Sequence, residues 1–339
     1  MALGAVDRLD GMAAGRVSAH DGMTADRVSA RMADNSGTAS LRETSAPVGE
    51  AAALRHEAAA LRHEAAEQGY LFFRRLIAAA DVLALRARVL DVCREIGWLD
   101  DAAPVALGVA RPGVRIGAYD AAWTSVQCRI QPLPEFGRLR EHPSIMGVLE
   151  TIHGRAVRCG RGDTCRIFSP GCPELTTRPH QDHFYVGGDT ALWTVWVPLG
   201  DCPLELGGLA VLPGSHRGGL LPHVGVAADE RGAETDKERG AGTGAERGAG
   251  AGAERGAGAG LERGAGAGAE RGDGTRGDRG VEIGIDAVWA SADYGCGDVL
   301  MFNSLTLHRA LENRTANRLR VSADFRYDPD PGARIEGHA

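Results

Sequence analysis

Apolar residues along the chain recur first at helical spacing and later in short runs. Residues 53–66 repeat the segment ALRHEAA twice, which predicts a surface helix with one leucine in each repeat. The stretch 69–76, GYLFFRRL, predicts a short strand, and residues 78–98 carry valine and leucine at the spacing of a second helix. From about residue 113 onward, short apolar segments alternate with glycine and proline, as in an all-β sandwich or barrel. The pattern therefore predicts a mainly β fold with flanking helices.

Two stretches interrupt this pattern because they hold few large apolar residues. Residues 1–50 are rich in Ala, Gly, Ser, Asp and Arg, so they cannot offset the ordering entropy of a fold, and we expect a disordered N-terminal extension. Residues 226–280 consist of AERGAGAG-type repeats, which we interpret as a low-complexity insertion in a surface loop between two strands. The rest of the chain, 51–335, is expected to form a single domain that this insertion interrupts.

Charge and cysteine content narrow the kinds of partner. A net charge of -7 and a pI near 5.9 provide no basic surface for nucleic acid or an anionic membrane, so we expect a small-molecule substrate. The seven cysteines are odd in number and form no CxxC pair, which argues against a disulfide framework or a zinc knuckle. Without a signal-peptide pattern or an apolar run of about 18 residues, the chain is predicted to be cytoplasmic. The sequence leaves the oligomeric state open and is compatible with a monomer.

Candidate metal ligands lie in two separate segments. His180 and Asp182 follow a turn rich in glycine and proline, and in an extended segment side chains two residues apart point the same way. The apolar run 299–307 leads to a third candidate, His308. Two histidines and one aspartate leave three positions of an octahedron open, the arrangement of Fe(II) oxygenases that bind a cosubstrate and O2. A closed zinc site would need four ligands, usually with cysteine, and neither ligand segment contains one.

An arginine in a following strand is a candidate anchor for the cosubstrate 2-oxoglutarate. Arg320 and Ser322 lie two residues apart in a segment of alternating character, so they share a face. When 2-oxoglutarate chelates iron through its keto acid, its far carboxylate needs a fixed cation, which a bidentate arginine assisted by a hydroxyl supplies. Arg318 has the same parity and is the second candidate. Arg314 and Arg326 we interpret as surface or salt-bridge residues.

The stretches around these residues resemble the phytanoyl-CoA dioxygenase family over roughly residues 70–330 without the insertion. The resemblance rests on SPGCPELTTRPHQDHFYV, LWTVWVPLGDCPLELGGLAVLPGSHRGGLL and GDVLMFNSLTLHRALENRTANRLRVSADFRY. It implies a double-stranded β-helix, the cupin-like jelly roll, with Fe(II), 2-oxoglutarate and O2. The family's metal ligands and its 2-oxoglutarate arginine fall on His180, Asp182, His308 and Arg320. The loop before the arginine is slightly longer than the family pattern, which keeps Arg318 as an alternative.

Three further residues are candidates for the cosubstrate pocket. Thr177 matches a family threonine that can hydrogen-bond the cosubstrate, with turn formation as the alternative role. Gln127 resembles a position that lines the pocket in relatives. Trp196 lies on the strand after the first ligand segment, where it can face either the pocket or the core.

The resemblance also bears on the type of reaction. Family members that halogenate replace the metal-binding carboxylate with a small residue, whereas Asp182 is present in this sequence. This implies hydroxylation of a small organic substrate with release of succinate and CO2. Two alternatives stay open, a jelly-roll protein that binds metal without turnover and an Fe(II) oxygenase that does not use 2-oxoglutarate. The combination of three ligands with Arg320 and Ser322 argues against both.

Overall fold

The computed structural model describes residues 38–46, 51–116, 121–160, 162–225, 279–284 and 286–334. The chain divides into two units, Met1–Asp34 and Asn35–Ala339, and every described residue belongs to the second. The predicted disordered extension and low-complexity insertion therefore lie largely outside the described residues.

The described unit combines α-helices, short 3-10 turns and strands. The α-helices are α2 (Ala51–Gln68), α3 (Ala79–Glu95), α4 (Ala121–Ile130), α5 (Pro134–Arg140), α6 (Pro143–His153) and α7 (Asp182–Val186). The 3-10 turns are η1 (Val105–Leu107), η2 (Pro173–Leu175), η3 (Leu204–Leu206) and η4 (Ser215–Gly218). The strands are β1 (Ala39–Ser40), β2 (Tyr70–Phe73), β3 (Arg155–Cys159), β4 (Thr164–Phe168), β5 (Trp193–Pro198), β6 (Leu209–Val211), β7 (Val224–Gly225), β8 (Arg279–Gly280), β9 (Ala290–Ser291), β10 (Val299–Asn303), β11 (His308–Ala310) and β12 (Arg320–Arg334). None of the described helices is long and apolar enough to cross a membrane.

Two sheets carry the fold. The larger has the strand order β2-β10-β5-β12-β3, with β4 also paired to β12, and the smaller has the order β1-β9-β6-β11. All pairs in the larger sheet are antiparallel, and the sheets do not close into a barrel. The mainly β jelly roll with flanking helices that the sequence predicted is confirmed.

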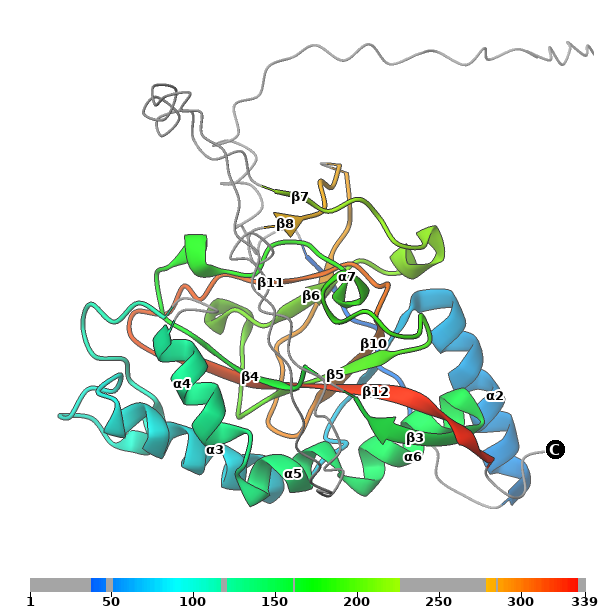
Figure 1. Ribbon diagram of the computed structural model, residues 1–339, viewed down its shortest axis with the longest axis horizontal. Helices are drawn as coiled ribbons and strands as arrows, with labels where there is room; N and C mark the ends of the chain where they lie inside the picture. The colour runs from blue at the N-terminus through cyan, green and yellow to red at the C-terminus, as the bar shows by residue number, and fades with distance from the viewer. Residues whose placement is uncertain are drawn as a thin grey trace, which may run out of the picture. The chain divides into compact units, whose positions relative to one another are not determined.

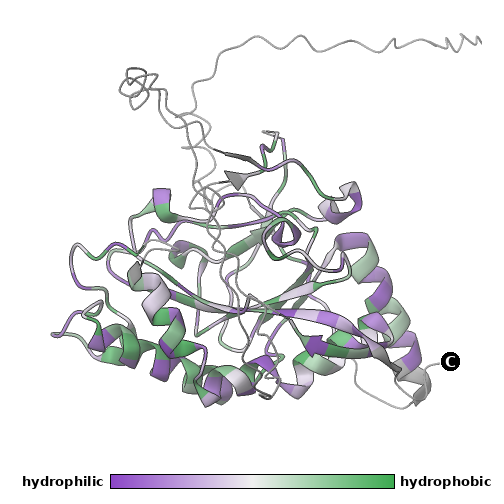
Figure 2. Ribbon diagram, viewed as in Figure 1, coloured by the Kyte–Doolittle hydropathy of each residue, from purple (hydrophilic) through white to green (hydrophobic). Residues whose placement is uncertain are grey.

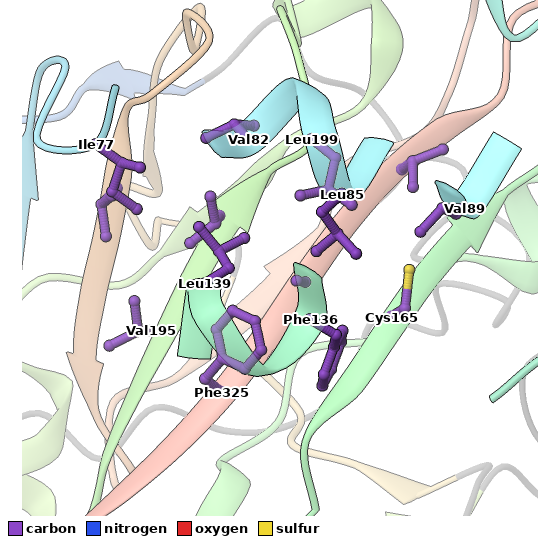
Figure 3. Packing of buried hydrophobic residues seen from close by; sticks show 14 of the residues in the cluster. Ile77, Val82, Leu85, Val89, Phe136, Leu139, Cys165, Val195, Leu199 and Phe325 are labelled. Carbon is purple, nitrogen blue, oxygen red and sulfur yellow. The ribbon is translucent and has the colours of Figure 1, made fainter. Parts of the chain in front are cut away.

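A layer of helices covers one face of the larger sheet. In Figure 1, α3, α5 and α6 form a row below β12 and β3 of the larger sheet, and α4 lies next to α3. Helix α3 turns Val82, Leu85 and Val89 inward, and Figure 3 shows these side chains packed with residues of α5 and of the strands. In Figure 2, these helices carry both hydrophobic and hydrophilic residues, as expected for helices with one face on a sheet.

The central strands divide their side chains between two faces. In β5, Val195 and Val197 belong to the core under the helices, whereas Thr194 and Trp196 lie on the opposite face. Strand β12 repeats this alternation, because its apolar side chains enter the same core and its polar ones share the other face with Thr194. Strand β5 and residues 320–328 of β12 are buried on both faces, and the polar face is the one that builds the site.

The prediction of short β segments from residue 113 onward was wrong for the first part of that region. The structure instead contains α4, α5 and α6 between residues 121 and 153. Pro134 and Pro143 looked like strand breaks, but each is the first residue of a helix, where its missing N–H costs no hydrogen bond. Phe136 and Leu139 in α5 have helical spacing and are buried.

The disordered extension was expected to reach residue 50, but residues 38–46 are ordered against the domain. Among residues 38–46, Ala39 and Ser40 pair in parallel with β9, and Leu41 is buried. The Thr44 hydroxyl accepts a hydrogen bond from Phe72 N at 3.1 Å. This segment therefore adds an edge strand to the smaller sheet.

Two leucines on α3 provide a test of the helix layer. Leu85 is 0% exposed in the core, whereas Leu83 is 46% exposed on the same helix. We expect Leu85→Ala to lower the free energy of unfolding by about 2–5 kcal/mol, because it leaves a cavity. Leu83→Ala should change it by less than about 0.5 kcal/mol. Urea denaturation followed by circular dichroism measures both, and equal losses would contradict this packing.

Candidate metal centre

The three predicted metal ligands meet in space. His180 and His308 form an antiparallel bridge in which each backbone N–H donates to the other's carbonyl at 3.0 Å, so their side chains lie next to each other. Oδ1 of Asp182 lies 3.5 Å from Nε2 of His180 and 3.5 Å from Nε2 of His308. One donor atom from each residue lies within 4.8 Å of the others, and all three residues are buried. The segments around residues 180 and 308 thus form one cluster of donors.

Asp182 reaches this cluster by a different route from the one that the sequence predicted. Gln181 is extended, with φ -114° and ψ 129°, but Asp182 is already the first residue of α7. The Gln181 side chain is fully buried, and its amide donates to Gly219 O at 2.8 Å and to Leu305 O at 2.6 Å. The position of the two ligands therefore depends on an isolated bridge at His180 that leads directly into a helix, and on a buried glutamine between them.

Both imidazoles have the tautomer that metal binding requires. Nδ1 of His180 lies 2.8 Å from Arg178 O, and Nδ1 of His308 lies 3.1 Å from Thr306 O. A carbonyl can only accept, so each Nδ1 carries the proton and each Nε2 presents its lone pair to the cluster. Burial lowers the pKa of His180 to about 4, which keeps its ring neutral at neutral pH.

The two oxygens of Asp182 have different partners. Oδ1 faces the histidines, while Oδ2 accepts from Thr194 Oγ1 at 2.7 Å and from Arg326 Nη2 at 3.1 Å. Burial alone would raise the pKa of Asp182, but Arg326 and the imidazoles outweigh burial and hold this pKa well below its usual range. The carboxylate is therefore ionised, with one oxygen directed at the metal position.

The donor set fits a single ferrous ion. Two neutral imidazole nitrogens and one carboxylate oxygen converge from one side, and no cysteine belongs to the group. Three such ligands leave coordination positions open, unlike a closed structural zinc site. The three residues therefore have the donors of a mononuclear metal centre, with positions left for further ligands.

A pocket lies next to the three ligands. Its lining residues come mainly from the inner faces of the two sheets and are Arg166, Thr177, His180, Asp182, Thr194, Trp196, Leu209, Phe302, His308, Ala310, Arg320, Asp324 and Arg326. Most of the charged groups come from β12 and its neighbour β4. The pocket therefore combines the metal position with a polar wall.

Arg320 lies in this polar wall without an ion-pair partner among the described residues. Its side chain is 1% exposed, its Nη1 donates to Ser322 Oγ at 2.6 Å, and its guanidinium lies 4.1 Å from the centre of the Phe168 ring. Burial lowers the pKa of Arg320 to about 10, so the group stays charged at neutral pH. Nε of Arg320 has no hydrogen-bond partner, and no carboxylate of the described residues forms an ion pair with it. A buried cation of this kind fits the far carboxylate of a dicarboxylate ligand.

Of the other predicted pocket residues, two line the pocket and two lie outside its lining. Thr177 and Trp196 line the pocket, and Trp196 Nε1 is buried without a partner. Arg318 is exposed and lies away from the lining. Gln127 is outside the lining too: its amide exchanges two hydrogen bonds with the backbone of Cys165, at 2.7 and 2.9 Å, and so ties α4 to β4. The structure thus gives Gln127 a structural role in place of the expected pocket position.

Arg326 was predicted to be a surface or salt-bridge residue, and its role at the site was not foreseen. The structure shows a buried salt bridge from Arg326 to the predicted metal ligand Asp182. Asp324 was missed as well; it lines the pocket and pairs with Arg166 at 2.7 Å. The signal was available, because both residues share the parity of Arg320 and Ser322 on one strand.

Two histidines and one aspartate gathered at a buried site in a jelly roll are the donor set of mononuclear non-haem iron enzymes. The chain belongs to the phytanoyl-CoA dioxygenase (PhyH) family, whose model matches residues 65–321. This confirms the resemblance seen in the sequence.

Two named relatives and one solved structure are similar to this chain. A 1-deoxypentalenic acid 11-beta-hydroxylase of Streptomyces exfoliatus is 23% identical over 269 residues, which are 78% of each chain. Its namesake of Streptomyces arenae is 32% identical over 130 residues, 35% of this chain and 44% of the relative. The epimerase SnoN of nogalamycin biosynthesis, solved with Fe3+, alpha ketoglutarate and nogalamycin RO, is 20% identical at a TM-score of 0.47, over 84% of this chain and 88% of that one.

Removing one ligand tests the metal centre. We expect His308→Ala to weaken Fe(II) binding by more than about 100-fold, because a ligand contributes more than its hydrogen-bonded supports, which already cost about 10–100-fold. The matched control is His183→Ala, next to Asp182 on α7 but outside the donor group. Anaerobic equilibrium dialysis with Fe(II) measures both. Equal affinities of the two variants would refute this ligand set.

Proposed function

We propose that this protein hydroxylates a small organic molecule with Fe(II), 2-oxoglutarate and O2. The observation that carries the proposal is Arg320, a buried cation without a carboxylate partner among the described residues, in the same pocket as the metal ligands. Arg320 supports 2-oxoglutarate as cosubstrate, because an oxygenase without this cosubstrate has no need for a buried cation there.

When bound, iron and 2-oxoglutarate would supply oxidative decarboxylation to succinate and CO2, with one oxygen atom of O2 going to the substrate and the other to succinate. The chain itself positions the metal ion and the cosubstrate and provides a buried, polar pocket around them. His180, Asp182 and His308 hold the metal ion, and Arg320 with Ser322 fixes the far carboxylate of the cosubstrate. Their burial keeps bulk water away from these charged groups and strengthens their electrostatic attraction.

Two pocket residues have assisting roles in this proposal. Trp196 has a buried indole N–H without a partner, so it can donate to an oxygen of the cosubstrate. Thr177 lines the same pocket, and its hydroxyl is a second candidate donor. Asp182 stands at the position where halogenating family members have a small residue in place of the carboxylate, which favours hydroxylation over halogenation. The names of the Streptomyces relatives, both hydroxylases of a small acid, support this reaction type.

We extend the proposal to the organisation and location of the chain. Residues 51–335 are proposed to form one domain that the segment 226–280 interrupts, since β7, directly before that segment, pairs antiparallel with β8, its last two residues. All seven cysteines are free, which supports a cytoplasmic location. The acidic charge balance supports a small-molecule substrate over nucleic acid or a membrane surface.

Two arginines on the same stretch of chain test the cosubstrate. We expect Arg320→Gln to raise the dissociation constant of 2-oxoglutarate by about 30-fold or more, because one partner of a buried charge pair is lost. Arg318→Gln is the matched control, as this side chain is exposed and should leave the constant unchanged. Anaerobic titration of the Fe(II) protein, followed through the visible charge-transfer band of the bound keto acid, measures both.

Each result bears on a different alternative. If the wild type binds Fe(II) without the band, the 2-oxoglutarate proposal is wrong, and an oxygenase without this cosubstrate or a non-catalytic metal protein takes its place. If the band forms and Arg318→Gln weakens binding more than Arg320→Gln, the anchor is Arg318.

A further inference from the structure

The carboxylate of Asp182 is held by its second oxygen. Oδ2 accepts hydrogen bonds from Thr194 Oγ1 at 2.7 Å and from Nη2 and Nε of Arg326 at 3.1 and 3.3 Å. Three donors on one oxygen occupy its lone pairs and fix the plane of the carboxylate. Oδ1 has no such donors and lies 3.5 Å from each histidine Nε2. The two oxygens of Asp182 are therefore not equivalent before any metal binds.

Thr194 and Arg326 form a directly opposed pair on neighbouring strands. In the antiparallel register of β5 and β12, Arg326 is the partner of Thr194. Thr194 is 1% exposed and Arg326 is 3% exposed. Opposed side chains on one face of a sheet lie close together, so both donors reach Asp182 from the same place. The sheet register itself brings them to the metal ligand.

Arg326 is fixed by contacts of its own. Its Nη1 donates to Gly162 O at 2.5 Å, and its backbone N–H donates to Asp163 Oδ1 at 3.0 Å. Asp324 Oδ2 lies 3.7 Å from Nη2 on the other side. These contacts hold the guanidinium in one orientation. The Thr194 hydroxyl is held by the rigid central strand β5.

An aspartate can bind a metal ion through one oxygen or through both. With one oxygen, two histidines and Asp182 leave three positions, two for the keto acid and one for O2. With both oxygens, only the two positions that the keto acid occupies would remain. We propose that Thr194 and Arg326 are a positioning pair that restricts Asp182 to one oxygen and thereby keeps the third position open. This inference rests on the proposed iron- and 2-oxoglutarate-dependent function.

A purely structural role for the pair makes a different prediction. If Thr194 and Arg326 only stabilise the fold, their loss lowers stability and leaves the number of open metal positions unchanged. If they position Asp182, the number of open positions falls while the keto acid still binds. A probe for the third position separates the two roles. Nitric oxide serves as that probe, because it binds ferrous iron at an open position and gives a characteristic EPR signal.

The experiment uses the full chain with Fe(II) and 2-oxoglutarate under anaerobic conditions. Thr194→Val is nearly isosteric and exchanges the hydroxyl for a methyl group, whereas Thr194→Ser keeps a hydroxyl at this position. We expect Thr194→Val to keep the keto acid charge-transfer band but to weaken nitric oxide binding by about 10-fold or more, the size typical of lost ligand supports. Thr194→Ser should behave as the wild type. Arg326→Gln should have the same effect as Thr194→Val, whereas Arg326→Lys should recover part of the affinity.

Three outcomes would overturn the proposal. Nitric oxide affinity in Thr194→Val equal to that of the wild type, with the band intact, would show that the pair does not control the open position. Loss of the band and of nitric oxide binding together would show that the pair retains the metal instead. A wild type without any band would overturn the proposed function itself. If Arg326→Gln fails to fold, Thr194→Val decides alone, with circular dichroism and the Tm as folding controls.

Discussion

The antiparallel pairing of β5 with β12 is the constraint on which the site depends. Its register places Thr194 opposite Arg326 and Trp196 opposite Asp324. Because side chains alternate, a shift by one residue would send every polar group of β12 into the apolar core under the helices. That core includes Val195 of β5 and Phe325 of β12, packed against Phe136 of α5 (Figure 3). The helix layer thus fixes the register, and the register assembles the metal support on the other face.

The polar face of β12 concentrates charge in a place where charge is costly. Removing an ion from water costs several kcal/mol even after relaxation, so buried charges need partners. Asp182 has Arg326, and Asp324 has Arg166. Arg320 is the member of this face that forms no ion pair with a described carboxylate, although a hydroxyl and an aromatic ring contact it. The imbalance favours an anionic ligand, since binding would relieve a desolvation cost that the folded protein already carries.

The sequence was informative where chemistry depends on short spacings. His180 and Asp182 are two residues apart, as are Arg320 and Ser322, and in both cases the structure brings the pair together. The sequence was less informative where tertiary packing determines the secondary structure or the position of a side chain. The helices α5 and α6 were predicted as β because prolines mark strand ends and helix starts alike. Gln127 was misplaced because a glutamine that binds backbone looks the same in sequence as one that binds a ligand.

The hardest residue to predict was Arg326, and the reason is physical. Its role depends on Asp182, 144 residues away along the chain, and on the pairing of two strands. A local pattern shows only that Arg326 has the parity of Arg320. Charged residues are mostly exposed, so parity alone favours a surface residue unless the strand pairing is known.

The loop that carries the metal ligands is bonded to both segments that flank the low-complexity insertion. On one side, Gln181 Nε2 donates to Gly219 O, and Gln181 N donates to His223 Nε2 at 3.1 Å. On the other side, Val281 N donates to Pro179 O at 2.8 Å. Val224 and Gly280 are paired across β7 and β8, so the ends of the insertion are held together next to the site. The entropic cost of closing a loop rises only slowly with its length. Because these contacts hold both ends of the insertion, a longer insertion would disturb the positions of the metal ligands little.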